Sequence, residues 1–204
     1  WIMGETSKVL NEVQISFESY RFNDAANTLY AFIWGKVCDW YVELSKPLFS
    51  SSNKRVIAET QETMGWVIDQ CLILLHPIMP FITEELWSSV GKRSNLLVHQ
   101  NWPNYTPSDL IEPDADQEMN WVISLIENIR SARQQMHVPA GFKIPLIFQE
   151  MSEAAQKTFE RNSIMIMKLA RISDVEKINH FPKGTVSVSA SGAIFGLPLA
   201  DVID

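Results

Sequence analysis

Residues 20–47 read YRFNDAANTLYAFIWGKVCDWYVELSKP, and the spacing of their apolar side chains determines the architecture that the sequence predicts. Apolar residues recur at intervals of three and four between Phe22 and Leu44, which is the period of one helical face. We therefore expect one long helix over residues 23–46, ended by Pro47. The opposite face carries mostly small residues, so the helix is expected to pack on two sides.

Four further segments have the helical period. They span residues 6–19, 56–74, 80–87 and 114–136. Beyond Gly141 the period of the apolar residues falls towards two, which indicates short strands. The strands are expected at residues 144–148, 175–178, 185–188 and 193–195, with a helix over residues 152–170 between the first two.

These segments predict a mainly α fold, in which an antiparallel helix bundle is followed by a small α/β subdomain. The expected domains are residues 1–140, which include a loop over residues 91–114, and residues 141–204.

The composition restricts the class of protein. The chain has 204 residues, 46% of them hydrophobic, with 17 basic and 24 acidic residues and a formal net charge of -7. This is typical of a globular protein and too acidic for binding nucleic acid over the whole surface, so any RNA contact must be local. The apolar runs, such as residues 71–75, are too short for a membrane span. No secretory signal is recognisable, so the cytoplasm is expected, and the opening Trp1 indicates an excised piece of a longer protein.

No arrangement of residues predicts catalysis, a metal site or a cofactor in this chain. Cys38 and Cys71 are far apart in the sequence and are expected to be reduced, buried thiols. The four histidines form no helical metal pair, and the eight glycines form no phosphate-binding loop. Asp39 and Glu43 are candidates for a pair of catalytic carboxylates, but each lies three residues from a lysine, which favours ion pairs.

The turn after the long helix, here called the hairpin tip (residues 46–55), has a distinctive charge pattern. No acid occurs between Glu43 and Glu59. The cations in this interval are Lys46, Lys54 and Arg55, and the aromatic side chains in or near it are Tyr41 and Phe49. A local charge of +3 beside aromatic rings suits single-stranded RNA, whose bases stack on aromatics while its phosphates meet cations. A solvated surface loop on a helix bundle is the alternative interpretation of the same pattern.

Two stretches of the chain resemble a known family. Residues 20–47 and residues 74–87, which read LLHPIMPFITEELW, resemble the anticodon-binding region of class I aminoacyl-tRNA synthetases, and most closely the valyl-tRNA synthetases among them. Further segments similar to that family are Trp1-Ile2, Asn101-Trp102-Pro103, Ile129-Arg130-Ser131-Ala132-Arg133 and Leu197-Pro198-Leu199-Ala200-Asp201-Val202-Ile203-Asp204. They occur in the family's order and cover nearly the whole chain.

The resemblance implies a parent enzyme that activates valine with ATP, esterifies it to tRNA and edits mischarged threonine. The family's His-Ile-Gly-His and Lys-Met-Ser-Lys-Ser signatures do not occur in these 204 residues, so the catalytic and editing domains are expected outside them. The implied partners are valine-specific tRNA and the remaining domains of the parent chain, including a coiled-coil arm, and a monomer is expected. The alternatives are the same region of an isoleucyl or leucyl enzyme, and a helical protein-interaction scaffold with its partner on the acidic residues 107–118.

By the same likeness, the anticodon surface of the family maps to the end of the long helix and the turn after it, which is the hairpin tip. We expect Tyr41 or Phe49 to stack on an anticodon base. The side chains expected to meet phosphates are Lys46, Lys54 and Arg55. Arg130 and Arg133, near the end of their helix, either reach RNA or complement the helix dipole.

Overall fold

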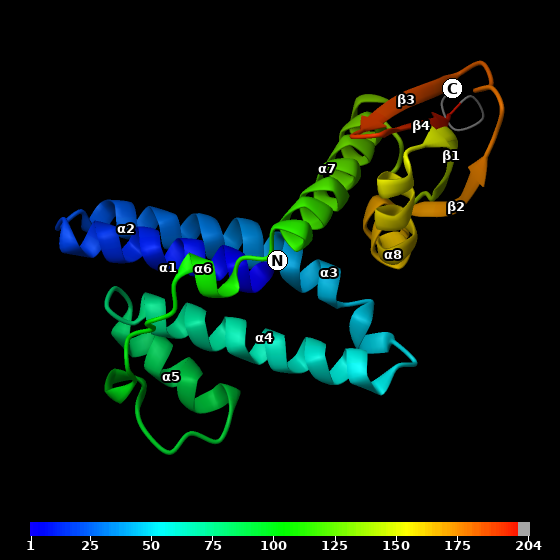
Figure 1. Cartoon of the computed structure of the whole chain (residues 1–204). Helices are drawn as coiled ribbons and strands as arrows, with labels where there is room; N and C mark the ends of the chain where they lie inside the picture. Colours follow the sequence, from blue (N-terminus) through cyan, green and yellow to red (C-terminus); the bar gives the residue numbers. More distant parts are fainter. Residues whose placement is uncertain (200–204) are drawn as a thin grey trace. The chain divides into compact units, whose positions relative to one another are not determined.

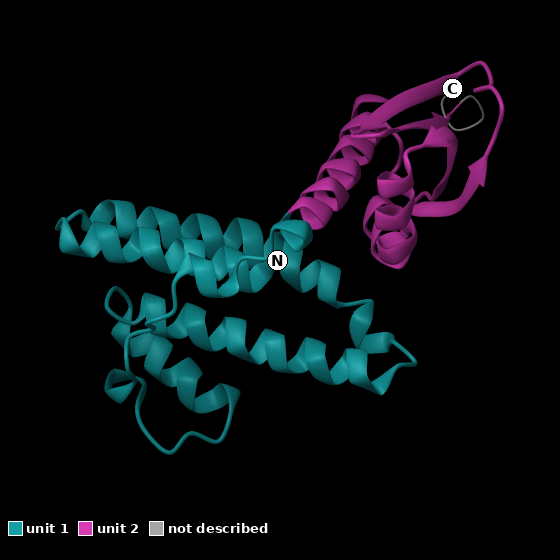
Figure 2. Ribbon diagram, in the orientation of Figure 1, with its two compact units in different colours: residues 1–116 teal, residues 117–204 magenta. Residues whose placement is uncertain are grey.

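The computed structural model describes residues 1–199, and the chain divides into two compact units, residues 1–116 and residues 117–204 (Figure 2). Helices are followed by a small sheet, so the predicted mainly α class is confirmed (Figure 1). Residues 200–204, the end of the family-like phrase that begins at Leu197, lie outside the described residues. Within residues 1–199, no helix combines the length and the apolarity that a bilayer crossing requires.

Every regular element of unit 1 is a helix or a helical turn. In chain order these are α1 (Ile2–Glu18), α2 (Phe22–Tyr30), η1 (Ala31–Val42), α3 (Glu43–Ser45), η2 (Leu48–Ser50), α4 (Lys54–Leu75), α5 (Pro80–Val90), η3 (Leu97–His99) and α6 (Pro107–Leu110), and α7 (Pro113–Gln135) begins in this unit. α1 and α2 pair as a helical hairpin, α4 contacts α1, and α5 packs next to α4 (Figure 1). The predicted bundle is therefore present.

α2, η1 and α3 follow one another without a break and form the long helix that the sequence predicts. The middle segment, η1, has π-helical hydrogen bonding, in which each bond spans five residues instead of four. The buried face follows this wider turn, because Phe32 and Val37 are both buried although they lie five residues apart. Ile33, which an α-helical period places on that face, is only half-buried.

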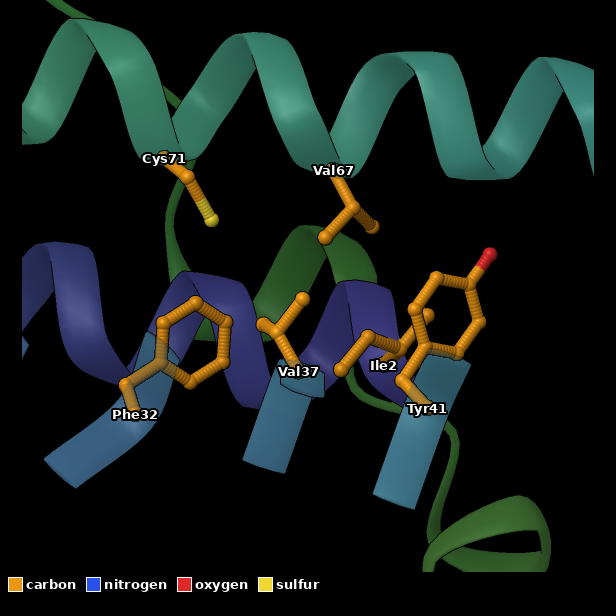
Figure 3. Close-up of a cluster of buried hydrophobic side chains, with 6 residues drawn as sticks. All are labelled: Ile2, Phe32, Val37, Tyr41, Val67 and Cys71. Atoms are coloured by element: carbon orange, nitrogen blue, oxygen red, sulfur yellow. The ribbon is translucent and has the colours of Figure 1, made fainter. Parts of the chain in front are cut away.

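The centre of unit 1 is a cluster of buried side chains from α1, η1 and α4 (Figure 3). Its members are Ile2, Phe32, Val37, Tyr41, Val67 and Cys71. A second cluster brings together Leu10, Val13, Ala25, Leu29 and Leu74. Burial of one large apolar side chain contributes about 1.5–3 kcal/mol. These clusters therefore hold the long helix against both α1 and α4.

Side-chain hydrogen bonds join α5 to the loop that follows it. The Glu84 carboxylate accepts from the backbone N–H groups of Leu97 and Val98, at 2.7 and 3.2 Å. The indole Nε1 of Trp87, which is buried, donates to the Asn95 carbonyl at 3.1 Å. Glu84 and Trp87, which lie in the segment 74–87 that resembles the family, therefore have a structural role.

Unit 2 contains a four-stranded sheet of order β2-β1-β4-β3. Its elements after α7 are β1 (Ile144–Met151), α8 (Glu153–Ala170), β2 (Ile172–Lys177), β3 (Thr185–Ala190) and β4 (Ala193–Pro198). β1 and β2 are parallel and are connected through α8, whereas β4 is antiparallel to both β1 and β3. The four predicted strands and the predicted helix are all present, and β2 begins three residues before residue 175.

Most of α7 belongs to unit 2, where polar side chains tie it to the turn before β4 and to the end of β3. Trp121 Nε1 donates to the Ser191 carbonyl at 2.8 Å, and Asn128 Nδ2 donates to the Ser189 carbonyl at 3.0 Å. The contacts between residues divide the chain into two units after residue 116. The sequence pattern instead predicts a boundary after residue 140, which places α7 in the bundle domain. The predicted domain boundary stays a prediction, because a division by contacts does not define a domain.

Candidate nucleic-acid interface

The hairpin tip is shaped by local hydrogen bonds between the end of the long helix and the start of α4. Ser45 Oγ donates to the Tyr41 carbonyl at 2.7 Å in the last turn of the long helix, and η2 then turns the chain. Asn53 caps α4, because its side-chain oxygen accepts from the Arg55 N–H at 3.0 Å. Ser51 Oγ accepts from the Asn53 N–H at 3.1 Å. These bonds fix the path of the backbone between the two helices.

Two of the three cations of the tip form ion pairs with acids, which the charge pattern of the tip did not predict. Lys46 forms an ion pair with Glu43, and Arg55 Nε lies 2.7 Å from a carboxylate oxygen of Glu59. From Glu43 to Glu59, three cations and two acids give a local charge of +1. The prediction of a +3 surface free of carboxylates is therefore wrong. Glu43 and Glu59 border the tip, and their helical spacing places each carboxylate next to a cation of the tip. Among residues 1–199, Lys54 has no ion-pair partner.

Solvent limits the strength of these ion pairs. The side chain of Arg55 is 85% exposed and that of Glu59 is 59% exposed. The hydrogen bond and the charge of Glu59 raise the pKa of the Arg55 guanidinium. Exposed pairs of this kind contribute little to stability and are screened by salt. Both cations are therefore held by partners that another anion can replace.

The first turn of α4 has no acid, although acids are the residues that a helix N-terminus favours. Lys54 and Arg55 occupy this turn instead. The positive end of the helix dipole and the two cations therefore attract anions in the same region. Phosphate is a natural complement of such an end, because exposed N–H groups and cations both bind its oxygens.

The two candidate aromatic side chains differ in exposure. Tyr41 is 8% exposed and packs in the cluster of Figure 3, and its burial raises the pKa of the phenol. Phe49, in η2, is 38% exposed. Of the two rings, Phe49 is the one that a base can reach without disturbing the core.

Arg130 and Arg133 lie on α7, in unit 2, and both donate hydrogen bonds to carbonyl groups. Arg130 Nε donates to the Leu169 carbonyl at 3.1 Å. Arg133 is 6% exposed, and its guanidinium donates to the carbonyls of Pro139, Phe142 and Arg171, at 3.2, 2.6 and 3.4 Å. Burial, and then the charge of Arg171, lower the pKa of Arg133. These contacts favour the structural alternative for Arg133.

The cysteine prediction is confirmed in one respect and wrong in another. Both thiols are free, but Cys38 is exposed and only Cys71 is buried. Burial, with a smaller effect of Cys38, raises the pKa of the Cys71 thiol to about 12. Among residues 1–199, no group of three or more histidine, cysteine, aspartate or glutamate side chains is placed to hold a metal ion.

The sequence reasoning missed an exposed apolar surface on α5 and the segments beside it, here called the α5 surface. Its members are Ile78, Met79, Phe81, Ile82, Leu86, Val90, Leu96 and Val98, all exposed. Phe81 is 91% exposed, and with Leu96 and Val98 it lines a groove of about 490 Å³. The sequence did contain a signal for this surface. α5 has more apolar residues than its one buried face, which is centred on Trp87, can hold.

Comparison with known proteins supplies the family. The family model for the anticodon-binding domain of tRNA ligase matches residues 1–148. The valine–tRNA ligase of Ruegeria pomeroyi is 58% identical over 204 residues, which are 100% of this chain and 20% of that protein. That of Cereibacter sphaeroides is 52% identical with the same coverage, and that of Zymomonas mobilis is 42% identical over 208 residues and 23% of its length. The chain spans about a fifth of the length of the curated relatives it matches. Because the family model covers well over half of its residues, this chain belongs to the family of anticodon-binding domains of tRNA ligases.

Proposed function

We propose that this chain is the anticodon-binding part of a valine–tRNA ligase, and that the longer protein joins valine to its tRNA with ATP. The observation that carries this proposal is the family match over residues 1–148. The name valine–tRNA ligase belongs to relatives that match the whole chain, which makes an isoleucyl or leucyl enzyme the less favoured assignment. ATP binding and catalysis would belong to other parts of the longer protein.

Valine-specific tRNA is the proposed partner, and the hairpin tip is the proposed contact surface for its anticodon loop. Phe49 offers an exposed ring for a base, and Lys54 offers a cation that lacks an ion-pair partner among the described residues. Lys46 and Arg55 add two cations whose acidic partners are exchangeable. Tyr41 would support the tip from the core. Arg130 is a secondary candidate for RNA contact, and Arg133 would act through the fold of unit 2.

The remaining parts of the longer protein are the second proposed partner, and the α5 surface is where they would pack. An apolar surface of this kind is rarely left open to water on a monomer. The relatives are about five times as long as this chain, so ample polypeptide exists to cover it. We also propose that the longer protein lies in the cytoplasm and is a monomer, and sedimentation of the purified protein would test the monomeric state.

The experiment that tests the proposed RNA surface uses the full-length ligase and its tRNA. Lys54→Ala combined with Arg55→Ala should weaken tRNA binding, and the slope of log affinity against log salt should fall by about two, one for each lost phosphate contact. The matched control is Lys143→Ala with Lys157→Ala, which removes two cations from unit 2. Equal affinities and slopes for the two double variants would reject the tip as the RNA surface.

The alternative function, a helical scaffold for another protein, makes a different prediction in the same assay. If the chain is such a scaffold and the tip is a solvated loop, the protein should have no affinity for tRNA even at low salt. A partner on the acidic residues 107–118 would then be sought. The exposed Asp109 of that segment is held in a capping box with Thr106, which lowers the pKa of its carboxyl.

A further inference from the structure

We propose that Glu43 and Glu59 attenuate RNA binding at the hairpin tip, each by occupying a cation that a phosphate would otherwise use. This inference rests on the proposed function, because it concerns the same surface. Neither acid is expected to touch RNA. They set the affinity of the site through Lys46 and Arg55.

The geometry of the two ion pairs is the first support. Glu43 is the first residue of α3 and contacts Lys46, three residues later. Glu59 lies on α4 and contacts Arg55, four residues earlier. The tip is therefore bordered on both sides by an acid that reaches back to one of its cations. Helical spacing alone maintains both contacts, so they are present before any RNA arrives.

The chemistry of the donors makes the two pairs unequal. Arg55 contacts Glu59 through Nε, and Nε together with one Nη forms an edge that binds two phosphate oxygens side by side. Full engagement of this edge by a phosphate requires the Glu59 carboxylate to leave. The Lys46 ammonium has three donors and uses one on Glu43, so a phosphate can approach it with less displacement. Glu59 is therefore the stronger attenuator.

The expected effects follow from the exposure of these pairs. Glu59→Gln keeps the size of the side chain and removes its charge, so it should tighten tRNA binding by the full-length ligase about two- to fourfold at low salt. Glu43→Gln should have a smaller effect in the same direction. The gain should shrink as salt rises, because salt already screens the ion pair in the unaltered protein.

Two controls separate this effect from a general change in charge. Glu62→Gln removes an exposed acid from the same helix, one with no ion-pair partner among residues 1–199, and should leave the affinity nearly unchanged. In an Arg55→Ala background, Glu59→Gln should lose its effect, because the cation that it releases is gone. A tightening that persists in that background, or that Glu62→Gln reproduces, would overturn the inference.

Failure of this inference and failure of the proposed function are distinguishable. If Arg55→Ala weakens tRNA binding but Glu59→Gln leaves it unchanged, the tip binds RNA and the acids do not attenuate it. If Arg55→Ala and Lys54→Ala both leave the affinity unchanged, the RNA surface is elsewhere and the inference falls with it. Thermal unfolding of each variant checks that the tip remains folded.

Discussion

The guanidinium of Arg93 lies over the indole ring of Trp87, 3.8 Å from the ring centre, and its Nη1 donates to the Asp69 carboxylate at 3.0 Å. Trp87 belongs to α5 and Asp69 to α4, while Arg93 lies in the loop after α5. A single side chain therefore clamps the loop to both helices. A cation held over a buried indole ring contributes about 1–2 kcal/mol.

Removal of this clamp should destabilise unit 1. We expect Arg93→Ala to lower the free energy of unfolding by about 1.5–3 kcal/mol, since both the ring contact and the partner of Asp69 are lost. Arg93→Lys should recover only part of the loss, because lysine lacks the planar group that lies over the ring and reaches the carboxylate. Urea denaturation measures these differences. Lys92→Ala, at the exposed neighbouring position, is the control, and an equal effect of both alanine variants would contradict the clamp.

Arg133 should behave as a structural residue of unit 2. Arg133→Ala removes a buried guanidinium that donates to three carbonyl groups, so we expect a loss of about 2–4 kcal/mol in the stability of this unit. Amide hydrogen exchange in β1 and β2 should quicken accordingly. Arg130→Ala, at an exposed position on the same helix, should cost less. The structural assignment fails if Arg133→Ala reduces the salt slope of tRNA binding while exchange in the sheet is unchanged.

Glu5 should make the stability of unit 1 sensitive to acid. Burial alone would raise the pKa of Glu5, but hydrogen bonds from Lys8 and Lys36 outweigh it, and the pKa lies below its ordinary value of 4.5. A carboxyl with a lowered pKa in the folded state stabilises the protein above its ordinary pKa, and this contribution is lost as the pH falls through the folded value. Glu5→Gln should therefore flatten the decline of stability between about pH 5 and pH 3.

Urea midpoints at a series of pH values measure this decline. Glu12→Gln serves as the comparison, because it removes an exposed carboxylate from the same helix without touching Lys8 or Lys36. Parallel curves for the unaltered chain and Glu5→Gln would show that the acid-sensitive group lies elsewhere.

Phe81 should matter only where the rest of the longer protein is present. In the isolated chain its side chain is almost fully exposed, so Phe81→Ser should change the stability by less than about 0.5 kcal/mol. If the rest of the longer protein covers the α5 surface, as proposed, the same substitution in the full-length protein should lower the unfolding temperature. Ile164, also exposed but on α8, provides a matched substitution, Ile164→Ser. Equal effects in the two proteins would exclude the α5 surface as an internal interface.

Much of the fold follows from periodicity, because the apolar period of a helix or strand is a local property of the chain. The long helix, α4 and the four strands are all readable in this way. The α-helical period predicts Ile33 on the buried face, but the structure buries Phe32 instead. The sequence could not predict this difference, since nothing in the local spacing indicates a π-helical turn.

The candidate site was predicted less completely. The contact of Lys46 with Glu43 was expected from the spacing, and the contact of Arg55 with Glu59 has a similar spacing that the charge count overlooked. Lys36 was expected to pair with Asp39 but contacts Glu5 of α1 at 3.0 Å. That choice depends on how two helices pack, which local spacing does not encode.

The π-hydrogen-bonded turns of η1 give the long helix an unusual tolerance to a change of length. Deleting one exposed residue between Phe32 and Val37 would leave the two buried side chains four apart, which an ordinary α-helix aligns on one face. The same deletion in the middle of α4 would rotate everything after it by about 100° and carry Cys71 and Leu74 out of the core. Homologous chains that differ in length within this bundle should therefore gain or lose their residue in η1.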